Sequence, residues 1–392
     1  MVTMQRFLSA VLLSFAFCIP ALSAPANVEV RRVPERGIKP GIVADASGAL
    51  HMVWFSGEPA AGDAFYAVSK DGGATWTKAL RVNSQPGSVL GASRARGPRL
   101  ALGSGGRAHV LWLGSGKAEP AGNPDTAAAA AGHHHAPAPL LYARMDDAGS
   151  AFEPQRKIFL HATGLDGDGS IAADKNGHVF AVAHAKEPGD TGEVQRSVYV
   201  ARSEDGGKTF AEEKSVLPKK TGVCACCALA VNVDAAGRPV ILYRQALQTF
   251  ERGMNMLTSA DGGKTFQLAK LDEWKLAACP MSVPALLPMR TGLLGAWENN
   301  GQIFFGTPGS GAKPLPGKGG TRKGPSLAVN ARGETLIAWT ENTSFAGGGD
   351  VVWQVFAADG QATDIAGRRK DLPPHGWVAA ASKADGGFVV LY

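Results

Sequence analysis

The sequence predicts an all-β protein, a β-propeller of seven four-stranded blades, with a six-bladed ring as the alternative. Three observations lead to this prediction. They are a composition rich in turn residues, a strand pair that recurs along the chain, and a second hairpin motif in the gaps between its copies.

The composition fits a chain with many strands and turns. The 392 residues include 50 Gly and 24 Pro, and only 19% are charged. A long helical protein or a disordered tail would be rich in charge and poor in Gly, so both classes are excluded. The formal net charge is +6, but no block of like charge stands out, so we expect no nucleic-acid binding.

Residues 1–26 read as a secretory signal peptide. Arg6 precedes an apolar run from Phe7 to Leu22, and small residues follow. The run is too short for a membrane span and no similar run follows, so the protein is not expected to span a membrane. We therefore expect an exported protein, periplasmic or secreted, in which residues 27–392 form a single domain.

The recurring strand pair has a Gly in its turn and an aromatic near the end of its second strand. Four aromatics fall six residues after the turn Gly, as in Gly48 with Trp54 and Gly106 with Trp112. The seven copies are residues 40–55, 98–113, 169–184, 227–244, 284–298, 325–340 and 377–392. The last copy supplies only two strands, so we expect residues 28–33 to add an outer strand and close the ring.

The gaps contain Ser-x-Asp-Gly-Gly-x-Thr followed by an aromatic, at residues 69–76, 203–210 and 259–266, with a worn copy at 145–152. In such a turn the Asp accepts backbone hydrogen bonds and the Gly pair permits positive φ. This motif resembles the Asp-box (BNR) repeats of the sialidase-like β-propellers. The resemblance implies that the motif turns are structural and lie on the face opposite most ligand sites.

The leading loops, which precede the innermost strand of each blade, are expected to line the working face. Those of blades 4 and 5 carry Cys224, Cys226 and Cys227, and Cys279 with Met281. Because these loops are equivalent in adjacent blades, the four cysteines should cluster near the central channel. An insertion at residues 117–139 holds further candidate ligands on this face, namely His133, His134 and His135, and other imidazoles there are His161, His184 and His375.

Three chemistries fit this cluster. An exported protein with four cysteines favours one or two disulfides. Thiolates with Met and His instead suit Cu(I), with Zn(II) second. A redox pair, in which one thiol attacks and a neighbour resolves, is the third. The stretch 224–252, with Trp274 and Cys279, resembles a group of bacterial exported sialidase-like proteins that share the Cys-x-Cys-Cys motif.

A glycoside hydrolase or glycan-binding propeller is the alternative function. Sialidases use three arginines, a Tyr nucleophile activated by a Glu, and an Asp acid/base, so the resemblance points to Tyr243, Arg244, Glu251 and Arg252 as catalytic candidates. The Arg-Ile-Pro signature is absent, however, and residues 36–40 read Arg-Gly-Ile-Lys-Pro instead. The repeat position of Tyr243 also matches the structural aromatics of the other blades. A partner protein on the broad propeller face is a third class.

Overall fold

The computed structural model describes residues 26–125, 137–217, 220, 222–248, 250–318, 320–344 and 347–392. The predicted signal peptide, apart from Ala26, and the candidate ligands His133, His134 and His135 lie outside the described residues. The described part of the chain forms strands and two short 3-10 helices, η1 (Pro34–Arg36) and η2 (Ser104–Gly106). None of its helices is long and apolar enough to cross a membrane.

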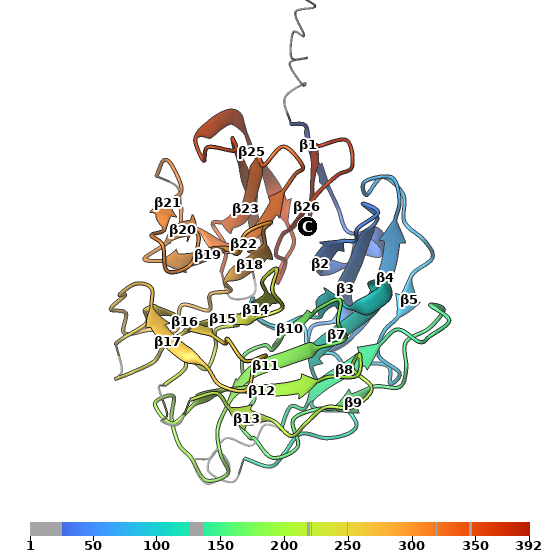
Figure 1. Cartoon of the computed structure of the whole chain (residues 1–392), viewed down its shortest axis with the longest axis vertical. Helices are drawn as coiled ribbons and strands as arrows, with labels where there is room; N and C mark the ends of the chain where they lie inside the picture. Colours follow the sequence, from blue (N-terminus) through green and yellow to red (C-terminus); the bar gives the residue numbers. More distant parts are fainter. Residues whose placement is uncertain are drawn as a thin grey trace, which may run out of the picture.

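Seven sheets form the blades of a ring (Figure 1), which confirms the predicted seven-bladed β-propeller. From the centre outwards, blades 1 and 2 consist of β2 (Ile38–Ala44), β3 (Leu50–Glu58), β4 (Ala61–Ser69), β5 (Leu80–Arg81), and of β6 (Arg99–Leu102), β7 (Ala108–Leu113), β8 (Leu140–Arg144), β9 (Arg156–Lys157). Blades 3 and 4 consist of β10 (Ser170–Ala173), β11 (Val179–Ala185), β12 (Ser197–Ser203), β13 (Lys214–Ser215), and of β14 (Ala230–Val233), β15 (Pro239–Arg244), β16 (Met254–Thr258), β17 (Gln267–Lys270). Blades 5 and 6 consist of β18 (Ala285–Pro288), β19 (Leu293–Asn299), β20 (Gln302–Gly306), β21 (Lys313–Pro314), and of β22 (Lys323–Val329), β23 (Thr335–Glu341), β24 (Gly349–Phe356), β25 (Ala362–Leu372).

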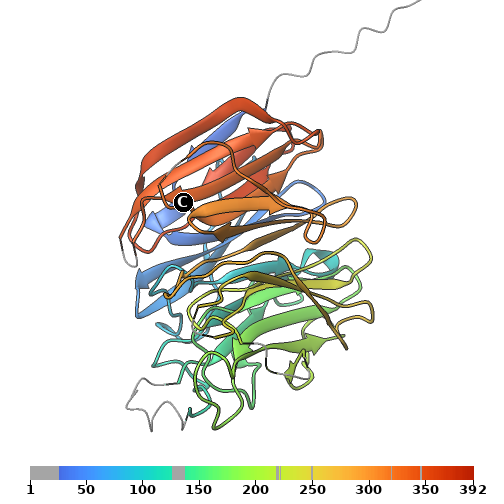
Figure 2. The same ribbon diagram turned by 90° about the vertical axis from the view of Figure 1, so that its left-hand side faces the viewer.

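The seventh blade closes the ring with strands from both ends of the sequence. It consists of β26 (Ala379–Ser382), β27 (Phe388–Leu391) and β1 (Val28–Arg31), and β1 runs parallel to β27. The predicted N-terminal strand is therefore confirmed, but this blade has three described strands, whereas the other six have four. Figure 2 shows the N-terminal strands in blue beside the C-terminal blades in red.

The hydrophobic core is divided into clusters between adjacent blades. Seven clusters each combine buried residues of two neighbouring blades. The predicted aromatics Trp54, Trp112, Tyr243 and Trp339 are all buried in these clusters. In blades 1, 2, 4 and 6, one large side chain at the same position thus fills the space where two twisted sheets meet.

The Ser-x-Asp-Gly-Gly turns join the third and fourth strands of blades 1, 3 and 4, and they share one hydrogen-bond pattern. In blade 3, the Ser203 hydroxyl donates to Asp205 at 2.8 Å and accepts the Gly207 N–H at 2.9 Å. Asp205 also accepts the Thr209 N–H at 2.9 Å, and Gly207 has φ 77°. Phe210 then packs against the core between blades 2 and 3, so this turn is structural.

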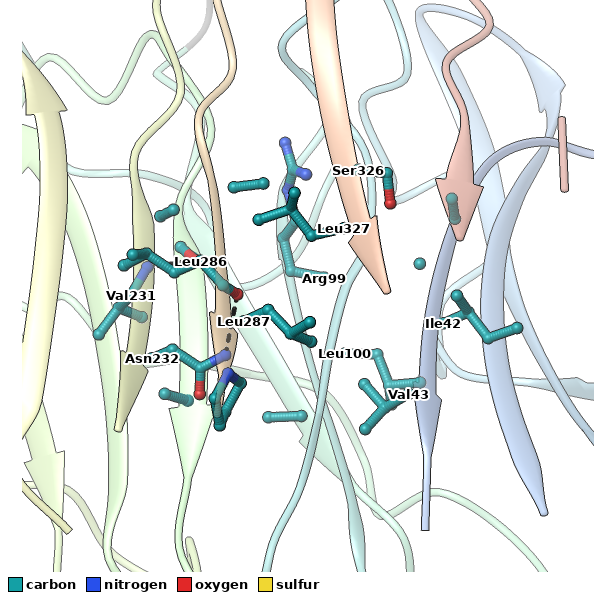
Figure 3. A pocket seen from close by; sticks show the side chains of 18 of the residues that line it. Ile42, Val43, Arg99, Leu100, Val231, Asn232, Leu286, Leu287, Ser326 and Leu327 are labelled. Carbon is teal, nitrogen blue, oxygen red and sulfur yellow. Dashed lines mark hydrogen bonds between the residues drawn. The ribbon is translucent and has the colours of Figure 1, made fainter. Parts of the chain in front are cut away.

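A central channel of about 800 Å³ runs between the innermost strands. Figure 3 shows its apolar lining, which includes Ile42, Val231 and Leu327. The innermost strands contact one another in the order β2, β6, β10, β14, β18, β22, β26 and back to β2. Because each of them begins on the same face, the seven leading loops gather around one mouth of the channel.

Candidate functional site

The four predicted cysteines meet on the leading-loop face. Cys224, Cys226 and Cys227 precede β14, and Cys279 precedes β18. A disulfide joins Cys226 to Cys279, with a Cα–Cα distance of 6.5 Å. Two of the candidate metal ligands are therefore oxidised in this structure, as the disulfide alternative expects.

The other two cysteines form a free, buried pair behind that disulfide. The Sγ atoms of Cys224 and Cys227 lie 3.0 Å apart, and Cys224 Sγ lies 3.5 Å from Cys226 Sγ. The three sulfurs are within 4.8 Å of one another. Cys224 and Cys227 are 0% and 2% exposed, Cys226 is partly buried, and Cys279 is exposed.

Cys224 and Cys227 also have the Cys-x-x-Cys spacing of thiol redox motifs. This spacing is present in the sequence inside the Cys-x-Cys-Cys run, and it is the signal that singles out the buried dithiol.

Charged side chains from blades 3 and 4 hold the cysteine loop in place. The Cys224 N–H donates to the carbonyl of Arg244 at 3.0 Å. The Ala225 N–H donates to the Glu193 carboxylate at 2.8 Å, and the Arg252 guanidinium donates to the same carboxylate at 2.7 Å. The loop backbone is thus fixed by an ion pair as well as by strand β15.

The surroundings of Cys227 favour a thiolate. Burial opposes ionisation, but the Cys224 thiol, the Arg244 charge and the N–H of Ser282 at 3.4 Å lower the pKa of Cys227 to about 7. The hydrogen bond to Cys227, together with burial, raises the pKa of Cys224 well above its usual value. The surroundings therefore favour a thiolate at Cys227 over one at Cys224.

His184 supports the same loop without facing a sulfur. Its Nε2–H donates to the Cys227 carbonyl at 3.0 Å, and its Nδ1 accepts from Arg196 at 3.2 Å. Burial, and then Arg196, lower the pKa of His184 to about 3, so the ring is neutral. Met281 lines the central channel, and exposed His161 lies 3.5 Å from Glu212.

The candidate catalytic residues of a sialidase-like site lie in different surroundings, although the Arg244 guanidinium donates to the carbonyl of Arg252. Tyr243 is buried in the core between blades 3 and 4, where its hydroxyl accepts from Asn255 at 3.1 Å. Arg244 is 1% exposed and donates to the Ser282 hydroxyl at 2.9 Å. Glu251 lines a separate, smaller cavity. None of Tyr243, Arg244, Glu251 and Arg252 is among the described residues that line the central channel.

The mouth of the channel also carries buried charged side chains. Lys39 is 0% exposed, donates to the carbonyl of Ser93 at 2.5 Å and lies over the Trp377 ring at 4.8 Å. Burial holds the pKa of Lys39 well below its usual value. Arg99 pairs with Asp168 at 2.7 Å, and burial raises the pKa of Asp168 to about 6.

Arg94 contributes a further cation to this mouth. It is 5% exposed and donates through Nη2 to the hydroxyl of Thr340 at 2.7 Å. Within the described part of the chain, its Nη1 has no hydrogen-bond partner. Nearby, Lys323 donates to the Glu298 carboxylate at 2.9 Å.

No family model matches the chain, and no curated protein matches it. Among solved structures, it is similar to a Hadza microbial sialidase, with 12% identity over 83% of this chain and 73% of that one, at a TM-score of 0.51. It is also similar to an α-L-arabinanase of Penicillium chrysogenum complexed with arabinobiose, with 15% identity over 86% and 98% of the two chains, at a TM-score of 0.51. An α-L-arabinofuranosidase of Fusarium graminearum matches with 12% identity over 88% and 97%, again at a TM-score of 0.51. The chain thus has the sialidase-like propeller fold.

Proposed function

We propose that this is an exported propeller that binds a soft metal ion, Cu(I) first and Zn(II) second, through the thiols of Cys224 and Cys227. The observation that carries the proposal is the buried free pair with Sγ atoms 3.0 Å apart. Thiolates are the ligands that Cu(I) prefers, and two of them suffice for a low coordination number.

The charges around the pair support an anionic thiolate site. Arg244 favours the thiolate of Cys227, and Ser282 donates to the same sulfur. The raised pKa of Cys224 keeps its thiol protonated in the protein alone. A bound monocation would compensate the charge of a second thiolate there. Cys226 and Cys279 would join the ligand set only after their disulfide is reduced, so the predicted four-sulfur site belongs to the reduced protein.

The predicted export agrees with the cysteine chemistry. A disulfide between two leading loops is typical of proteins that mature in an oxidising compartment. The periplasm or the cell exterior is therefore the proposed location, and the signal peptide the route.

The experiment is a Cu(I) titration of the untagged mature protein against a chromogenic chelator, with elemental analysis of the protein as purified. We expect one Cu(I) per chain in the wild type, no binding in Cys224→Ser/Cys227→Ser, and retained binding in the matched control Cys226→Ser/Cys279→Ser. Failure of the wild type to compete with the chelator, or equal binding by all three proteins, would sink the proposal.

A glycan ligand in the central channel is a second candidate, favoured by Arg94, whose Nη1 has no hydrogen-bond partner among the described residues, and by Arg99 and Trp377 in the same channel lining. Arginine donors and an aromatic face are the groups with which proteins bind acidic sugars. Cleavage of a fluorogenic sialoside or arabinoside, lost in Arg94→Lys but retained in Tyr243→Phe, would support it. No cleavage and no binding of either sugar would end it.

A further inference from the structure

The four sulfurs are arranged in order of depth. Cys279 is exposed, Cys226 is partly buried, and Cys224 and Cys227 are buried. Successive sulfurs are bonded or in contact, by the Cys226–Cys279 disulfide, by 3.5 Å from Cys226 to Cys224, and by 3.0 Å from Cys224 to Cys227. An oxidised pair at the surface thus lies directly in front of a reduced pair that solvent does not reach.

We propose that this site is a thiol–disulfide relay, which passes the electron pair of the buried dithiol to the exposed disulfide and from there to a disulfide in solution. This activity goes beyond metal binding, and it does not need a metal. Thiol–disulfide exchange requires an attacking thiol in contact with a disulfide sulfur, and Cys224 meets that requirement at Cys226.

The first step moves the disulfide inwards by one sulfur. Cys224 Sγ loses its proton, which passes through solvent to the leaving sulfur, and attacks Cys226 Sγ over their 3.5 Å contact. A Cys224–Cys226 bond forms, the Cys226–Cys279 bond breaks, and Cys279 leaves as a thiolate that solvent can protonate.

The second step completes the transfer. Cys227 Sγ attacks Cys224 Sγ, a Cys224–Cys227 bond forms, and Cys226 leaves and takes the proton that Cys227 loses. The chain still has one disulfide and two thiols, but the thiols are now Cys226 and Cys279. A disulfide in solution, such as oxidised glutathione, can then reoxidise these two thiols, which yields two molecules of reduced thiol and restores the Cys226–Cys279 bond.

The relay gives the buried pair a route to oxidants that its burial otherwise denies it. Cys224 and Cys227 are 0% and 2% exposed, and Cys226 of the disulfide lies 3.5 Å from Cys224. Direct attack by a small disulfide would need the leading loop to open. Exchange through Cys226 needs only the contacts that the structure already has.

The first experiment traps the intermediates by alkylating the folded protein with iodoacetamide and mapping the disulfides by mass spectrometry. In Cys227→Ser, the second step is blocked, so a Cys224–Cys226 disulfide and alkylated Cys279 should accumulate. In Cys224→Ser, the first step is blocked, so the Cys226–Cys279 disulfide should persist. Two outcomes would overturn the relay: alkylation of Cys279 at the same rate in both variants, or no alkylation of Cys279 in either variant.

The second experiment measures oxidation of the Cys224 and Cys227 pair by oxidised glutathione. The wild type should acquire both disulfides. In Cys226→Ala/Cys279→Ala, which lacks the exposed pair, oxidation of Cys224 and Cys227 should be slower by about tenfold or more. Equal rates would overturn the proposal. Tryptophan fluorescence checks that each variant is folded. The Cu(I) titration of the reduced wild type measures metal binding separately, so failure of the relay and failure of metal binding are distinguishable.

Discussion

Removal of the Cys226–Cys279 disulfide should lower the stability of the propeller by a predictable amount. The bond closes a loop with a sequence separation of 53 residues that contains the whole of blade 4. In the chain-entropy account, opening a loop of that size lowers the free energy of the unfolded chain by about 4 kcal/mol at 25 °C, because the chain gains conformational entropy. We therefore expect the unfolding free energy of Cys226→Ala/Cys279→Ala, measured by urea denaturation, to be about 4 kcal/mol lower than that of the wild type.

The matched control is Cys224→Ala/Cys227→Ala, which removes two buried thiols but keeps the disulfide. Its loss should be about 1 kcal/mol per thiol, and a reductant should destabilise it further. The variant without the disulfide should be insensitive to the same reductant. A loss below about 1 kcal/mol in Cys226→Ala/Cys279→Ala, or an equal response of both variants to reductant, would refute the reasoning.

Three further predictions concern buried contacts. Burial raises the pKa of Asp168 to about 6 in the folded protein, above its unfolded value, so the contribution of Asp168 to stability should be greatest below about pH 4 and fall by on the order of 3 kcal/mol as the pH rises through about 6. Asp168→Asn should remove that fall in urea denaturation across the same pH range, and an unchanged slope would contradict the assignment. Ser203→Ala leaves the buried N–H of Gly207 without its acceptor and should cost about 1–3 kcal/mol, whereas no loss of stability would mean that water replaces the hydroxyl. A Cβ at Gly167 would lie 2.2 Å from His184 Nε2, so Gly167→Ala should lower stability by roughly 1–3 kcal/mol and speed iodoacetamide modification of the cysteine pair; wild-type behaviour in both assays would show that the ring is not needed there.

The blade count could be predicted from the sequence because the repeat fixes where each strand pair begins and where its aromatic falls. Trp54, Trp112 and Trp339 occupy equivalent places between blades, as their spacing from the turn Gly indicates. The same equivalence placed Cys279 beside Cys226, although 53 positions separate them. Repeat alignment therefore predicts proximity between leading loops as well as fold.

Cysteine pairing could not be predicted in the same way. Four cysteines allow three pairings, and the choice depends on Cα distances and side-chain directions that no spacing encodes. The buried charges Lys39 and Asp168 gave no periodic signal either. Each looks like an ordinary loop or strand-edge residue in the sequence, and only the closing of the ring encloses it at the channel mouth.

Strand alternation places the side chains of Tyr243 and Arg244 in different surroundings. Successive side chains of β15 point to opposite faces of the sheet, so Tyr243 enters the core with blade 3, whereas Arg244 faces blade 5. There its guanidinium donates to Ser282, which contacts Cys227 Sγ, and to the carbonyl of Glu298.

Arg244 therefore connects the two charged parts of the leading-loop face. The Glu298 carboxylate binds Lys323, which lines the channel, while Ser282 lies against the Cys227 sulfur. A change of charge at Cys227, through metal binding or oxidation, removes an anion that Arg244 helps to balance. Because a buried cation is costly without compensation, we expect the Arg244 guanidinium to move closer to Glu298. The state of the Cys227 sulfur would then affect the charged groups at the mouth of the channel.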